Sequence, residues 1–108
     1  MNQISEDIIV KYASTDAELE ELKAIYRSSK QELGFLPDGA FQERFDRRQI
    51  LVVVKARTVA GYVLFSINQE YEVRIAHLVV EKAFQGRGLS HLLIDRLKQT
   101  SPLTPVFD

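Results

Sequence analysis

The segment Gln85–Ser90, which reads QGRGLS, has the residue types and spacing of an anion-binding turn. It follows Ile75–Val80, an apolar run typical of a buried strand, and precedes leucines at helical spacing. The first turn of a helix has unpaired backbone N–H groups and the positive end of the helix dipole. Because glycines let a phosphate approach these groups and Arg87 adds positive charge, the segment predicts a phosphate site. The alternative is that Gly86 and Gly88 only form a tight connection without a ligand.

The N-terminal half predicts one strand and two helices. Ile8–Tyr12 is expected to be a strand. A capping-box spacing of Thr15 and Glu18 then predicts a helix that continues to Leu33, where Gly34 can end it. A short helix over Ala40–Arg48 should follow an unusually apolar loop. The loop and this helix contribute three aromatic residues that either pack in the core or wall a substrate pocket: Phe35, Phe41 and Phe45.

Three strands are expected next, over Ile50–Val54, Val59–Ile67 and Glu72–Val80. The first shows no alternation, so both of its faces should be covered by helices. Gly61, inside the second, marks a bulge or a site of close backbone approach. The turn near Arg57 is poorly marked, since it has neither Gly nor Asn.

Strict alternation in the strand Glu72–Val80 would place Val73, Ile75 and His77 on one face, and Arg74 and Ala76 on the other. The last helix should end near Thr100 because Pro102 cannot continue it. A final strand should then begin at Thr104-Pro105-Val106-Phe107.

Composition narrows the classes of protein. The chain has 108 residues, which favours a single domain over 1–108, and a net charge of −1, which argues against binding to nucleic acid. No cysteine is present, so disulfides and cysteine metal sites are excluded. We expect no metal and a cytoplasmic protein, since the N-terminus is acidic where a signal peptide would be basic. No apolar run approaches the ~18 residues of a membrane span.

This order of elements, β-α-α-β-β-β-α-β with the glycine turn after the fourth strand, resembles the GNAT N-acetyltransferase superfamily. The family signature is Gln or Arg, two residues, Gly, one residue, then Gly or Ala. Here Gln85, Gly88 and Ser90 occupy those places, and Ser90 departs from the pattern. The resemblance implies an α/β fold with a mixed, mostly antiparallel sheet and helices on both faces.

The resemblance also implies a cofactor site. Acetyl-CoA would lie where the fourth strand splays from the fifth and would transfer its acetyl group to an amine. Backbone groups of the strand, in the segment Leu78, Val79 and Val80, would pair with the pantetheine arm. The turn, from Gln85, Gly86, Arg87, Gly88 and Leu89 to Ser90, would hold the pyrophosphate, with His91 either nearby or simply exposed.

The resemblance implies a general base, for which Glu72 is the first candidate, Glu70 the second and His77 the third. Each has a plainer interpretation: carboxylates near a turn are usually solvated, and a histidine on a buried strand usually belongs to the core. Family members commonly continue with another helix and two strands, which often carry the tyrosine that protonates the departing thiolate. Relative to this pattern the chain is expected to be short at its C-terminus and to lack the last helix and strands, either as a truncated form, as one that a partner chain completes, or as a domain that kept acyl-CoA binding and lost catalysis. None of this chain's tyrosines stands at a matching position.

Three functions therefore remain open from the sequence. The first is an acetyl-CoA-dependent N-acetyltransferase for an unidentified amine. The second is a degenerate domain that binds acyl-CoA or dimerises without turnover. The third, a different nucleotide-binding domain, lacks a P-loop or dinucleotide glycine pattern. A sheet with an unpaired edge strand also predicts a homo-oligomer, most simply a dimer.

Overall fold

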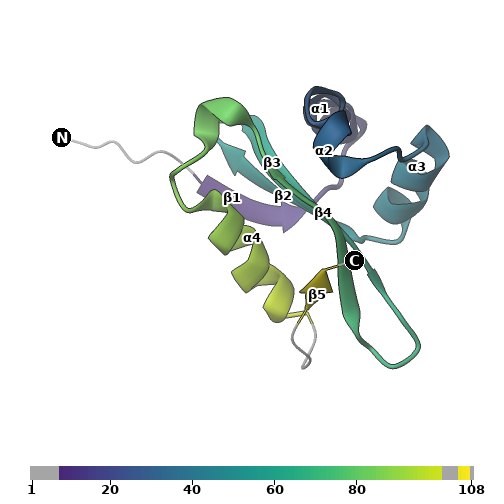
Figure 1. Cartoon of the computed structure of the whole chain (residues 1–108). Helices are drawn as coiled ribbons and strands as arrows, with labels where there is room; N and C mark the ends of the chain where they lie inside the picture. Colours follow the sequence, from purple (N-terminus) through teal and green to yellow (C-terminus); the bar gives the residue numbers. More distant parts are fainter. Residues whose placement is uncertain (1–7, 101–104, 108) are drawn as a thin grey trace.

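A five-stranded sheet with helices packed on it forms the structure, which is described here from a computed structural model for residues 8–100 and 105–107. The sheet order follows the sequence, and the neighbours are antiparallel except for β4 and β5, which are parallel (Figure 1). The predicted mixed sheet and the order of its strands are therefore confirmed. The elements are β1 (Ile8–Tyr12), α1 (Asp16–Ser28), α2 (Lys30–Leu33), α3 (Asp38–Asp46), β2 (Ile50–Lys55), β3 (Thr58–Ile67), β4 (Val73–Val80), the 3₁₀ turn η1 (Lys82–Phe84), α4 (Leu89–Lys98) and β5 (Val106–Phe107).

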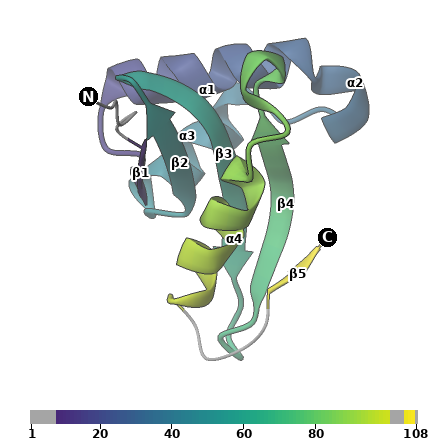
Figure 2. The same ribbon diagram turned by 90° about the vertical axis from the view of Figure 1, so that its left-hand side faces the viewer.

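Helices cover both faces of the sheet, as the unalternating β2 sequence predicts. Ile50 and Val52 belong to a core shared with α1 and α3, whereas Leu51 and Val53 belong to a second core shared with α4. All four side chains are fully buried. Figure 2 shows α4 in front of the sheet and α3 behind it. The sheet thus separates an α1 face from an α4 face.

The helix predicted to run to Leu33 is in fact two helices. Its start is as expected: Thr15 accepts a hydrogen bond from the Glu18 N–H group, and Glu18 caps the Thr15 N–H group in return. The prediction of continuity was wrong because α1 stops at Ser29, whose backbone is not helical. Serines compete for backbone hydrogen bonds and end helices readily. Gly34 does end α2, with a φ of 81° and its N–H group bonded to the Lys30 carbonyl.

One helix and one turn differ from what the sequence predicts. α3 occupies Asp38–Asp46, so it begins and ends two residues before the predicted helix. The β2–β3 turn places both Ala56 and Arg57 in the left-handed region, at φ 50° and 68°. Such a turn favours Asn or Gly, which explains why the sequence marks it poorly.

A bulge in β4 overturns the predicted alternation of its side chains. Leu64 and Phe65 are consecutive in β3, but they pair with His77 and Ile75, so Ala76 is the extra residue. Ile75 consequently packs in the α4-face core, whereas His77 points to Tyr26 and Phe41 on the α1 face. Ile75 and His77 therefore lie on opposite faces, not on the same face.

Among the described residues, β5 pairs with β4 only at Arg74 and Ile75, so the outer edge of β4 beyond the bulge is open. α4 ends at Lys98, shortly before the predicted boundary. The predictions that rest on Pro102, Thr104 and residues 1–7 lie outside the described residues. Within the described part of the chain, no helix is long and apolar enough to cross a membrane.

At Gly61 the backbone of β4 approaches closely, as the place of this glycine in a strand predicts. A Cβ atom built there would be 2.6 Å from the Val79 carbonyl oxygen. The irregularity beside it, where Val53 and Val54 pair with Gly61 and Val59, leaves Ala60 as an extra residue. The backbone of β3 must therefore stay without a side chain at this point.

We expect Gly61→Ala to destabilise the fold by about 1–3 kcal/mol, because the β4 backbone would have to move. Urea unfolding measures this, with Gly39→Ala as the matched control. Nothing lies within 4 Å of a Cβ at Gly39, which is helical, so the control should be neutral or stabilise by about 0.5–1 kcal/mol. Equal stability of the two variants would contradict the close approach.

Candidate functional site

The glycine turn needs its glycines for backbone conformation. Gly86 and Gly88 have φ angles of 78° and 77°, which other L-residues rarely adopt. Nothing lies within 4 Å of a Cβ built at either position. The two glycines are therefore not required by close packing against the core, and the space next to them is open to a ligand.

The start of α4 presents unpaired backbone donors. Gly88 is its N-cap residue, and no side chain caps this end. The first intrahelical bond runs from the Leu92 N–H group to the Gly88 carbonyl, at 3.2 Å. Before it, the N–H groups of Leu89, Ser90 and His91 have no acceptor in the part of the chain that the structure describes. With the helix dipole and the exposed Arg87, these donors could bind an anion where the sequence predicts a phosphate site.

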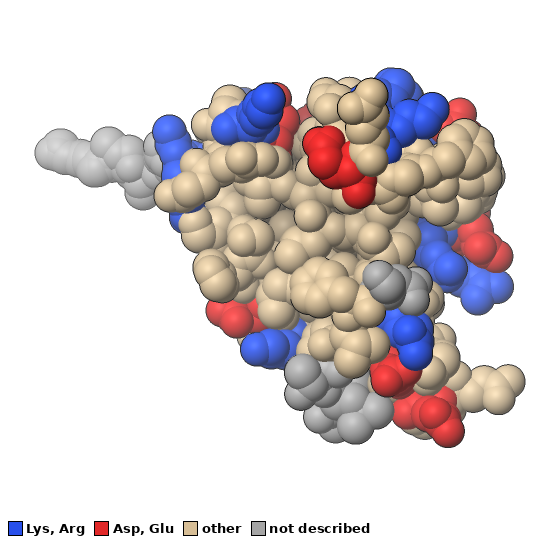
Figure 3. Space-filling model, viewed as in Figure 1, with Lys and Arg blue, Asp and Glu red and all other residues tan. Residues whose placement is uncertain are grey.

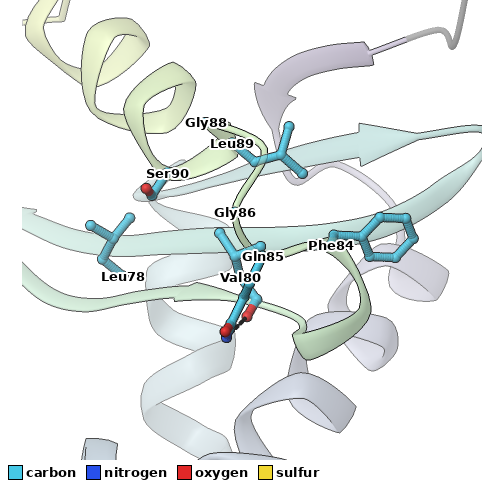
Figure 4. A pocket seen from close by; sticks show the side chains of 8 residues that line it. All are labelled: Leu78, Val80, Phe84, Gln85, Gly86, Gly88, Leu89 and Ser90. Carbon is cyan, nitrogen blue, oxygen red and sulfur yellow. Dashed lines mark hydrogen bonds between the residues drawn. The ribbon is translucent and has the colours of Figure 1, made fainter.

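A pocket of about 230 Å³ opens beside these donors (Figure 4). One wall comes from β4, the other from the turn and the start of α4. The Gln85 side-chain amide donates to the Val80 carbonyl at 2.9 Å and so joins the turn to the end of β4. The lining residues are Leu78, Val80, Phe84, Gln85, Gly86, Gly88, Leu89 and Ser90.

The backbone of β4 also offers hydrogen-bonding groups at its open edge. The Glu81 N–H group donates to Ala60 at 2.7 Å, so alternate residues from this point backward face β3. By this alternation Leu78 and Val80 direct their backbone N–H and C=O groups away from β3. Val79 faces β3, and its side chain is buried in the α1-face core, so the structure does not bring it to the pocket.

The two carboxylate candidates lie at the other end of β4. Glu70 is exposed on the β3–β4 turn, at the bottom of Figure 1. Glu72 is partly buried, accepts a hydrogen bond from Asn68 at 3.1 Å and pairs with Arg74 at 3.2 Å. Eight residues of strand separate Glu72 from Val80, roughly 26 Å at about 3.3 Å per residue. The structure therefore does not bring these carboxylates to the glycine turn.

His77 is enclosed by aromatic side chains on the α1 face. It is 4% exposed, and its Nδ1 atom lies 3.0 Å from the Tyr62 hydroxyl, with which it shares a hydrogen bond. Its ring stacks on Tyr26 at 5.5 Å and meets the edge of Phe41 at 6.0 Å. Burial lowers the pKa of His77 and raises that of Tyr62, because both charged forms are desolvated. Both side chains are thus kept neutral.

Sequence reasoning missed Phe84 as part of the pocket. It stands in η1 just before the turn, and the ammonium group of the buried Lys55 lies 5.7 Å from its ring centre. An aromatic residue directly before the glycine turn was the available signal. His91 is exposed in the first turn of α4.

None of the side chains that line this pocket is charged. In Figure 3 the centre of the face shown is tan, and Lys, Arg, Asp and Glu atoms lie around it. Among the described residues no group of three or more His, Asp or Glu side chains could hold a metal ion.

The structure thus combines an α/β fold with unpaired helix N–H groups that border a pocket beside an open strand edge. The sequence profile of the Acetyltransferase (GNAT) domain family matches residues 13–104. Because this match spans most of the chain, the protein belongs to the GNAT acetyltransferase family. No curated protein matches the chain.

Solved structures share this fold at low sequence identity. N-acetylglutamate synthase from Neisseria gonorrhoeae, solved with coenzyme A and N-acetyl-glutamate, is 13% identical with a TM-score of 0.77, covering 90% of this chain and 23% of that one. An N-acetyltransferase from Staphylococcus aureus Mu50 is 18% identical with a TM-score of 0.70, covering 87% and 66%. Arabidopsis thaliana Naa50, bound to the bisubstrate analogue CoA-Ac-MVNAL, is 13% identical with a TM-score of 0.68, covering 86% and 63%. The chain thus spans between 23% and 66% of these proteins.

Burial of His77 predicts a pH dependence of stability. Its pKa in the folded protein lies below the ordinary value of 6.5, so the unfolded chain binds this proton first as the pH falls. The contribution of neutral His77 to the free energy of unfolding should be fully present above about pH 6.5 and should be lost as the pH falls towards the pKa of the folded state. Urea unfolding at several pH values measures the slope.

The two histidines of the chain provide a matched test of this slope. His77→Phe should flatten the pH dependence of the unfolding free energy below about pH 6.5, whereas His91→Gln should keep it. An unchanged slope in His77→Phe would show that another group is responsible.

Proposed function

We propose that this protein is an acetyl-CoA-dependent N-acetyltransferase that acetylates an amine. The carrying observation is the glycine turn, whose unpaired N–H groups border a pocket at the open edge of β4 in a member of the GNAT family. Similar folds have been solved with coenzyme A or a CoA-containing bisubstrate analogue.

In this proposal acetyl-CoA lies along the pocket, from the glycine turn to β4. The N–H groups between Gly86 and Ser90 hold the pyrophosphate, and Arg87 neutralises part of its charge. The pantetheine arm then pairs with Leu78 and Val80 like an added strand. The uncharged side chains that line the pocket suit this uncharged arm, and Phe84 and Leu89 add apolar contacts.

The reaction requires one bond to form and one to break. The amine nitrogen attacks the thioester carbonyl carbon, the carbon–sulfur bond breaks, and no covalent enzyme intermediate forms. The ammonium proton leaves to a base or a water chain, and the thiolate leaves as the thiol after protonation.

We propose Glu72 as the base, ahead of Glu70 and His77. Glu72 is partly buried and held by Asn68 and Arg74, so its carboxylate is positioned, whereas Glu70 is exposed at the tip of the turn. His77 is enclosed by aromatic rings, which argues for a core role. Because Glu72 lies several residues from the open edge, it would act through water.

A non-catalytic acyl-CoA-binding domain is the second candidate. One observation favours it: none of the three candidate bases lines the pocket at the turn. Turnover of acetyl-CoA with any amine distinguishes the two. The third interpretation, another nucleotide-binding domain, would require nucleotides without pantetheine to compete equally well. We also propose a homo-oligomer, which the unpaired outer edge of the sheet at β5, among the described residues, supports.

We expect calorimetric titration of the protein with acetyl-CoA to give a Kd on the order of micromolar. Arg87→Ala should weaken binding about tenfold, since one charge-assisted contact is lost. The double variant Arg87→Ala, Gly88→Trp should not bind, because the indole would occupy the approach to the N–H groups.

Arg47→Ala is the matched control, since Arg47 is an exposed arginine after α3 on the other face of the sheet. It should bind acetyl-CoA like the wild type. Wild-type binding by the double variant, or no binding by a wild-type chain that circular dichroism shows to be folded, would remove the site from the turn.

We expect Glu72→Gln to lower kcat about 100-fold with little change in the KM for acetyl-CoA, because it removes a proton acceptor and not a binding group. Steady-state kinetics at several pH values measures this, and the acidic limb of the rate profile should disappear. Glu43→Gln, in α3, serves as the control. A full kcat in Glu72→Gln would exclude Glu72 as the base.

A further inference from the structure

A second pocket, which we call the cationic pocket, lies on the α1 face between α1, α2 and the start of α3. Its volume is about 350 Å³. Three of its side chains are basic and only one is acidic. The lining residues are Lys23, Tyr26, Arg27, Lys30, Phe35, Leu36, Pro37 and Asp38.

One wall of this pocket is fixed by a tyrosine. The Tyr26 hydroxyl donates to the Gly34 carbonyl at 2.8 Å and accepts from the Leu36 N–H group at 2.7 Å. These two bonds hold both sides of Phe35, which is 74% exposed. An aromatic side chain is therefore kept in solvent by a built arrangement, where apolar contact with a ligand would be favourable.

The charges of the pocket are unevenly compensated. Lys23 is buried between Glu20 and Asp38, at 3.6 and 3.9 Å. Arg27 is exposed and makes no ion pair with the described residues, and the Lys30 ammonium lies 5.3 Å from the Phe35 ring centre, without an acidic partner there. The pocket thus has positive charge available beside an aromatic surface.

The cationic pocket lies next to β4 through a packed aromatic pair, on the opposite face of the sheet from the pocket at the glycine turn. Tyr26, which lines it, stacks on His77, the residue directly after the bulge. The next residue, Leu78, lines the pocket at the glycine turn on the α4 face. The two pockets thus lie on opposite faces of the sheet beside neighbouring residues of β4, so an acceptor held in the cationic pocket would reach acetyl-CoA at the open edge of β4 from the α1 face.

We propose that the cationic pocket binds the acceptor and that the acceptor amine carries an anionic group, a carboxylate or a phosphate, held by Arg27 and Lys30. Phe35 contacts the apolar part of the same molecule. This inference rests on the proposed acetyltransferase function. Basic residues near the end of α1 also suit its dipole, but that role would change stability and leave acceptor preference unaffected.

The test compares amines in matched pairs: phenylalanine with phenylalaninamide, and phosphoethanolamine with ethanolamine. Acetylation should have a kcat/KM about tenfold higher for the anionic member of at least one pair, and the pair that responds tells carboxylate from phosphate. In Arg27→Gln, Lys30→Gln the preference should be lost through the KM of the acceptor. Lys98→Gln, an exposed lysine on α4, should keep it.

Donor binding separates the two proposals. If acetyl-CoA does not bind the wild type, the proposed function fails. If it binds, but neutral and anionic amines react equally or the double variant keeps the preference, only this inference is overturned. If no amine reacts, titration of phenylalanine and of phosphoethanolamine into the CoA-saturated protein decides, and absence of binding by both overturns it.

Discussion

The extra residue at Ala76 is the constraint that decides which face of the sheet each later β4 side chain joins. Before it, β4 side chains such as Ile75 follow one alternation, and after it the alternation is reversed. The reversal turns His77 towards Tyr26 on the α1 face and leaves Leu78 and Val80 on the α4 face. One inserted residue therefore connects β4 to the cationic pocket on one side and to the glycine turn on the other.

The glycine turn was largely predictable because its requirements are local. Positive φ angles at Gly86 and Gly88 and the unpaired donors of α4 follow from residue type and helix geometry. The capping box at Thr15 and Glu18 and the doubly covered β2 were predictable for the same reason. Phe84 was missed because its place in the pocket depends on how η1 turns back towards β2.

The features that escaped prediction are set by pairing between distant residues. Nothing in the β4 sequence marks Ala76 as a bulge, because the register is decided against Leu64 and Phe65. The break at Ser29 likewise accompanies the bonds of Tyr26 to the following loop, which a helical pattern does not contain. The predicted direction of the His77 side chain was wrong for this reason, because the prediction assumed strict alternation through a strand that contains a bulge.

The hydrogen bond between the Gln85 amide and the Val80 carbonyl has a consequence for the tendency of the protein to aggregate through the edge of β4. An open strand edge is a template onto which other chains can add, and natural proteins protect such edges. Here the Gln85 side chain of the same molecule already donates to the Val80 carbonyl at the end of that edge, so an added strand would find one free acceptor fewer. Any occupant of the edge must share this carbonyl with Gln85 or displace it, which favours a specific ligand over indiscriminate aggregation.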